Sequence, residues 1–97
     1  MDKKINILGV EYVVQEVEVV NKETPERGEI NYLTNVIKID REMPLSQKNH
    51  TLMHEILHAV FDMLGLDELR DDESKIQMIA TGIHQVFSSQ KVFFEES

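Results

Sequence analysis

The chain has no cysteine among its 97 residues, which excludes disulfides, thiolate metal sites and cysteine nucleophiles. It also has no run of eighteen apolar residues, so no helix that crosses a bilayer is expected. The first residues lack the apolar stretch and the small-residue cleavage site of a signal peptide. These absences together predict a cytoplasmic protein that does not enter a membrane.

Positive charge is scarce as well: ten Lys and Arg stand against eighteen Asp and Glu, a net charge of −8. An acidic field repels phosphate groups, so neither nucleic acid nor an anionic membrane surface is expected as a partner. Because 41% of the residues are hydrophobic, the chain is not a disordered acidic tail either. The length fits a single domain, residues 1–97, with a thin core, and the sequence does not indicate its oligomeric state.

The pattern of residues changes near residue 43. Before it, β-branched and aromatic residues predict three or four short strands between residues 5 and 40, the second of them over 10–20, with Gly9 in a turn after the first. Short connections favour antiparallel pairing of these strands. We therefore expect an α+β fold: a small antiparallel sheet with two helices on one face.

Both predicted helices follow residue 43 and show apolar residues at helical spacing. The first spans about 46–64, with Ser46 as the N-cap and Gly65 just beyond its end. The second spans about 71–89, with Asp71 or Asp72 as the N-cap. The acidic segment 67–72 lacks the spacing and the glycine of an EF-hand, so a solvated connection rather than a calcium site is expected there.

The first predicted helix carries the motif H-E-x-x-H at His54-Glu55-Ile56-Leu57-His58. Residues four apart lie one turn apart, so both imidazoles can reach one metal ion. Glu55 is then placed to accept the proton of a water at the open coordination position. The alternative is two exposed histidines that happen to flank a glutamate. Their position beside the apolar face of the helix favours a zinc (Zn²⁺) site.

Two histidines hold zinc poorly, and a third protein ligand is expected from the second helix. Glu73 and His84 share one side of that helix but lie about 16 Å apart along its axis, so only one can bind the ion. Glu73 follows the connection by about as many residues as His58 precedes it, which favours Glu73. Asp72 and His84 remain as alternatives, and iron, cobalt or nickel can use the same ligand types.

Three further polar residues lie on the same sides of the two helices as the expected ligands: His50, Gln77 and His84. Each is a candidate residue of the cleft. Either histidine can donate a hydrogen bond to a tetrahedral oxyanion. Alternatively, each is a half-buried helix residue bonded to backbone or water, which is the interpretation that we favour.

Four segments carry a family resemblance: residues 28–32 (GEINY), 37–40 (IKID), 51–59 (TLMHEILHA) and 80–87 (ATGIHQVF). Together they resemble small phage and prophage zincin-like proteins related to the ImmA/IrrE-type metallopeptidases, within the gluzincin group. The resemblance implies a minimal zincin-like fold. Where that group tends to have a tyrosine, this chain has His84, so a transition-state role at that position is in doubt.

The resemblance also implies the site and its use. His54, His58 and Glu73 would be the zinc ligands and Glu55 the general acid and base of a metallopeptidase. An edge strand beside the active-site helix, here expected to be residues 36–40, would bind an extended protein or peptide substrate, such as a regulatory protein. The small size of the chain supports a different hypothesis, a non-catalytic, zinc-stabilised protein-binding module of phage or mobile-element origin.

Overall fold

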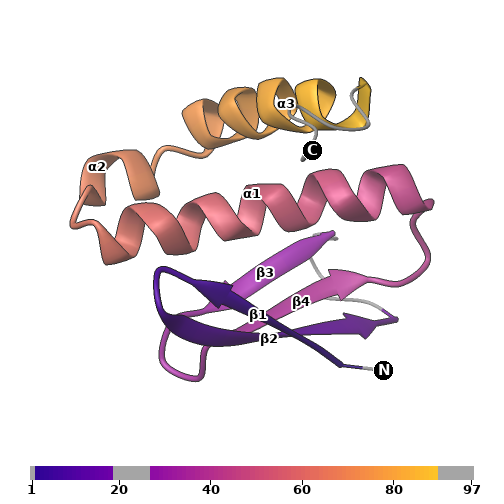
Figure 1. Ribbon diagram of the computed structural model, residues 1–97, viewed down its shortest axis with the longest axis horizontal. Helices are drawn as coiled ribbons and strands as arrows, with labels where there is room; N and C mark the ends of the chain where they lie inside the picture. Colours follow the sequence, from indigo (N-terminus) through magenta and orange to yellow (C-terminus); the bar gives the residue numbers. More distant parts are fainter. Residues whose placement is uncertain (1, 19–26, 90–97) are drawn as a thin grey trace, which may run out of the picture.

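A computed structural model describes residues 2–18 and 27–89 (Figure 1). It confirms the α+β class; residues 19 and 20 of the second predicted strand lie outside the described residues. No helix in this part of the chain is both long and apolar enough to cross a membrane. The elements are β1 (Lys3–Ile7), β2 (Val10–Val17), β3 (Gly28–Asn31), β4 (Val36–Asp40), α1 (Leu45–Met63), α2 (Asp67–Arg70) and α3 (Glu73–Ser89).

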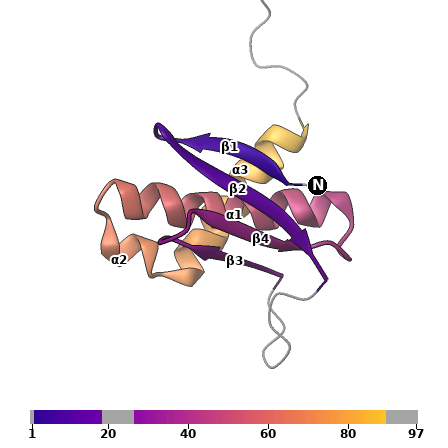
Figure 2. The same cartoon turned by 90° about the horizontal axis from the view of Figure 1, so that it is seen from below.

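The four strands form one mixed sheet in the order β1-β2-β4-β3 (Figure 2). β1 pairs with β2 and β3 with β4 in antiparallel fashion, whereas β2 and β4 run parallel, with Val13 opposite Val36. The prediction of an antiparallel sheet is therefore wrong. The physical reason is burial: Ile37 and Ile39 of β4 are almost completely buried, and an inner strand with a neighbour on each side gives them that cover.

α1 and α3 form two successive layers above the sheet (Figure 1). α1 packs Ile56 and Ala59 against the sheet, and its Leu57 packs against Ile76 and Ala80 of α3. Within the described residues, α3 contacts α1 and α2 but not the sheet. The prediction that both helices lie on the sheet is thus wrong. The apolar surface of α1 is wide enough to pack against the sheet on one side and against α3 on the other.

The ends of α1 differ in how well the sequence predicts them. The helix begins at Leu45, with Pro44 at the N-cap position and no side-chain cap, so the predicted cap Ser46 is wrong and lies within the first turn. At the other end, Gly65 has a positive φ of 73°, and its N–H donates a hydrogen bond back into the last turn. Gly65 is therefore confirmed as the residue that ends the helix.

α3 begins at Glu73 because Asp72 caps it. The Oδ1 atom of Asp72 accepts a hydrogen bond from the backbone N–H of Lys75 at 3.0 Å. Of the two predicted caps, Asp72 is confirmed and Asp71 is not; Asp71 instead accepts a hydrogen bond from Arg70 at 2.8 Å. The helix start places Glu73 in the first turn, with its side chain next to α1.

The connection between α1 and α3 contains the short helix α2, which was not predicted, and its residues Asp67, Glu68 and Asp71 are exposed, as expected for a solvated connection. Arg70, at the end of α2, donates to Asp62 Oδ1 of α1 at 2.7 Å and lies 3.4 Å from Asp67 Oδ1. These contacts hold the connection against the last turns of α1 and thereby fix the position from which α3 starts.

Candidate metal centre

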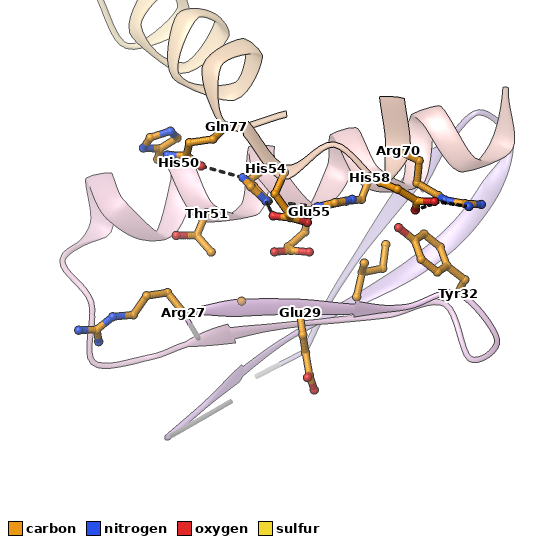
Figure 3. A pocket seen from close by; sticks show the side chains of 14 residues that line it. Arg27, Glu29, Tyr32, His50, Thr51, His54, Glu55, His58, Arg70 and Gln77 are labelled. Carbon is orange, nitrogen blue, oxygen red and sulfur yellow. Dashed lines mark hydrogen bonds and ion pairs between the residues drawn. The ribbon is translucent and has the colours of Figure 1, made fainter. Parts of the chain in front are cut away.

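The H-E-x-x-H motif lies in the middle of α1, and both of its histidines face the first turn of α3 (Figure 3). His54 Nε2 lies 3.0 Å from Glu73 Oε2, and His58 Nε2 lies 2.7 Å from Glu73 Oε1. The two Nε2 atoms are 3.3 Å apart. The structure thus brings together the three residues that the sequence favours as ligands, with all their ligand atoms within 4.8 Å of one another.

The two histidine nitrogens already have a separation that suits one tetrahedral ion. Ligand atoms about 2.0–2.2 Å from a tetrahedral zinc lie roughly 3.3–3.5 Å from one another. The Nε2 atoms of His54 and His58 are 3.3 Å apart. The contacts of 3.0 and 2.7 Å to Glu73 involve its two different oxygens, so the carboxylate would have to shift for one oxygen to join both nitrogens at a shared ion.

Gln77 orients the first histidine. Its Oε1 atom lies 2.7 Å from His54 Nδ1, and because an amide oxygen only accepts, Nδ1–H is the donor. In the neutral tautomer with a proton on Nδ1, the lone pair of His54 Nε2 faces the carboxylate of Glu73 and the second imidazole. Lone pairs that converge in this way repel one another unless a proton or a metal ion lies between them. Gln77 was predicted as a cleft residue, and it contacts a candidate ligand.

The other two candidates for the third ligand lie elsewhere. The carboxylate of Asp72 caps α3. His84 lies further along α3, where its ring stacks on that of His50. Of the three candidates, the described structure brings only Glu73 into the cluster with His54 and His58.

Glu55 is buried between α1 and β3, with 7% of its surface exposed, and its carboxylate points toward the strand (Figure 3). A Cβ atom at Gly28 would lie 3.2 Å from Glu55 Oε2 and 2.6 Å from Thr51 Cγ2. A side chain at Gly28 therefore fits only if Thr51 shifts. The glycine allows the backbone of β3 to lie directly against the proposed general base.

A cavity of about 780 Å³ opens between α1, β3 and the first turn of α3. Glu55 and the three candidate ligands line it, together with two of the three predicted cleft residues, His50 and Gln77; His84 is not among its lining residues. Sequence reasoning missed the other eight lining residues. Of these, Thr51 precedes His54 by nearly one turn and so carried a helical signal, whereas no local spacing marks Arg27, Tyr32 or Arg70.

Two groups at the His58 end of the cavity have shifted pKa values. Burial, and next to it the carboxylate of Asp62, raises the pKa of Tyr32 to about 12. The phenol therefore keeps its proton at neutral pH and can donate a hydrogen bond. Hydrogen bonds from Arg70 lower the pKa of Asp71, which stays ionised.

β3 is the edge strand that borders the cavity. Gly28, Glu29 and Ile30 line the space in front of Glu55, and among residues 2–18 and 27–89 only β4 pairs with this strand. The expectation that residues 36–40 form this edge is wrong, because β4 is paired with β2 on one side and with β3 on the other. The inner position of β4 follows from its buried isoleucines.

Comparison of the chain with protein-family models, with curated proteins and with solved structures found no match. The chemistry assigned to the centre therefore rests on the residues of this chain and on their geometry.

Proposed function

We propose that the chain is a zinc-dependent metallopeptidase that hydrolyses a peptide bond in a protein or peptide substrate. The observation that carries the proposal is the convergence of His54, His58 and Glu73 beside a buried carboxylate. Two imidazoles and one carboxylate suit zinc and leave a coordination position open. A cytoplasmic location remains a prediction from the sequence.

The proposed mechanism assigns a task to each side chain. The histidines and Glu73 hold the ion, and Gln77 fixes the orientation of His54. Zinc supplies Lewis-acid polarisation of the scissile carbonyl and of the attacking water. Glu55 accepts the proton of that water and then delivers it to the leaving amine.

The cavity also supports the proposed type of substrate. An extended peptide can add to the open edge of β3 through backbone hydrogen bonds, in front of Glu55. The missing side chain at Gly28 keeps the approach between β3 and α1 close. The protonated hydroxyl of Tyr32 lines the same space and is the donor that we propose for the substrate oxyanion.

The second candidate function is a non-catalytic binding module of phage or mobile-element origin that uses zinc for stability. It is favoured by the position of the ligands, since an ion held by His54, His58 and Glu73 links α1 to a helix that lies outside the main core. A purely structural site does not need Glu55, however. The buried carboxylate is the reason to prefer the enzyme.

Zinc per chain, measured by elemental analysis on wild type and on Glu73→Ala, tests the metal site. We expect one equivalent in the wild type and a large loss in the variant. A folded wild type that takes up no zinc when zinc is supplied would contradict both candidate functions.

Cleavage of a peptide library by zinc-loaded protein separates the two functions. Glu55→Gln should keep the metal and lose turnover by about 10²–10⁴-fold, because the general base is removed. Glu11→Gln is the matched control, since this exposed carboxylate of β2 does not line the cavity, whereas Glu55 points from α1 toward β3 (Figure 3). Cleavage by Glu55→Gln at the wild-type rate would refute the mechanism. A wild type that binds zinc and cleaves nothing would favour the binding module.

A further inference from the structure

A second pair of histidines lies across the interface between α1 and α3, apart from the three candidate ligands. The rings of His50 and His84 are stacked, with centroids 5.2 Å apart and planes inclined by 13°. His50 precedes His54 by one helical turn, and His84 lies about 16 Å beyond Glu73 along α3. The pair therefore occupies a different level of the interface.

The Nε2 atoms of this pair face hydroxyl groups. His50 Nε2 lies 3.0 Å from Thr81 Oγ1, and His84 Nε2 lies 3.3 Å from Ser88 Oγ. Thr81 and Ser88 are exposed, so water can take over these hydrogen bonds if either imidazole turns to another partner. The surrounding chain has a net charge of −8, which raises the local concentration of cations.

We propose that His50 and His84 form a second site for a transition-metal ion of the zinc type, with one imidazole from each helix. Imidazole is a preferred ligand of Zn²⁺, Ni²⁺ and Cu²⁺. The rings are stacked, so their in-plane nitrogen lone pairs run nearly parallel, and at least one side chain must turn out of the stack before a nitrogen of each ring can bind one ion. The centroids are only 5.2 Å apart, so such a turn brings the two nitrogens within reach of a shared ion. Water can occupy the remaining positions. With two protein ligands, this site binds more weakly than the one at Glu73.

Calorimetric titration of the metal-free protein with Zn²⁺ tests the proposal. We expect two binding events in the wild type, a strong one and a weaker one. His84→Phe should lose the weaker event completely, because phenylalanine keeps an aromatic ring against His50 but has no nitrogen donor. Thr81→Val is the matched control: it removes the hydroxyl, keeps both imidazoles and should retain two events.

The Glu73→Ala variant separates this site from the proposed catalytic one, because it should weaken the strong event and leave the weak one. A weak event that survives in His84→Phe, or a wild type that shows only the strong event, would overturn the second site without affecting the proposed function. If His84→Phe does not fold, His50→Phe makes the same test from α1. Side-chain NMR spectra of the histidines, recorded during the titration, identify the rings that bind.

Discussion

Replacement of Gly28 by alanine tests the contact between β3 and α1 that borders the cavity. A Cβ at this position would lie 2.6 Å from Thr51 Cγ2, 3.2 Å from Glu55 Oε2 and 3.3 Å from Ile39 Cδ1. Overpacking of this kind costs about 1–3 kcal/mol, and the reduced freedom of the unfolded chain offsets about 0.4–1 kcal/mol of it. We therefore expect Gly28→Ala to lower the free energy of unfolding by about 1–2 kcal/mol.

Urea denaturation of metal-free protein, followed by circular dichroism, measures this change. Gly82→Ala is the control, because a Cβ at Gly82 of α3 meets nothing within 4 Å and should stabilise the helix by about 0.5–1 kcal/mol. Thr51→Ser removes the methyl group nearest to the new Cβ, so Gly28→Ala should cost less in that background. An unchanged free energy of unfolding in Gly28→Ala, or the same cost with and without Thr51→Ser, would refute the reasoning.

Two further predictions concern the metal centre and acid stability. Gln77→Leu should weaken zinc binding by about 10–100-fold, because His54 loses the acceptor that orients it; equal affinity in a chelator competition would contradict that role. A hydrogen bond from the Glu42 backbone N–H, followed by the ion pair with Arg27, lowers the pKa of Asp40 below its ordinary 3.8. The pKa of Asp40 is therefore lower in the folded than in the unfolded protein. The ionised carboxylate stabilises the fold at pH values above the unfolded pKa, and this stabilisation is lost as the pH falls through the folded pKa. Asp40→Asn should therefore flatten the acid side of the stability profile, and an acid titration with the wild-type slope would contradict this.

The centre is the part of the structure that the sequence predicts best, because helix geometry relates spacing to position. His54 and His58 are four positions apart, which places them about one turn apart on any α-helix. Glu73 follows the connection between the helices by about as many residues as His58 precedes it, so the two residues are expected to face each other. The structure places Glu73 with the two histidines. Gln77 follows by one turn, so its side chain also faces α1.

The strand order and the layering of the helices are not encoded in such local patterns. Alternation along a strand tells which residues share a face, but not which strand lies alongside, so the parallel pair β2–β4 had no signal. An apolar stripe likewise does not specify its partner, and α3 uses its stripe against α1 rather than the sheet. Tyr32, just after β3, lines the cavity because of how the sheet packs on α1, which no local pattern specifies.

The outer position of α3 has a consequence for how metal affinity is set. Because Glu73 belongs to a helix held mainly by α1, the zinc affinity of the proposed site would include the free energy of keeping that helix docked. The contact of Leu57 with Ile76 and Ala80 would then contribute to the proposed metal binding, although none of the three belongs to the candidate ligands. Thermodynamic linkage would make the relation reciprocal: zinc bound at this site would strengthen the docking of α3 by the same free energy that docking adds to zinc binding.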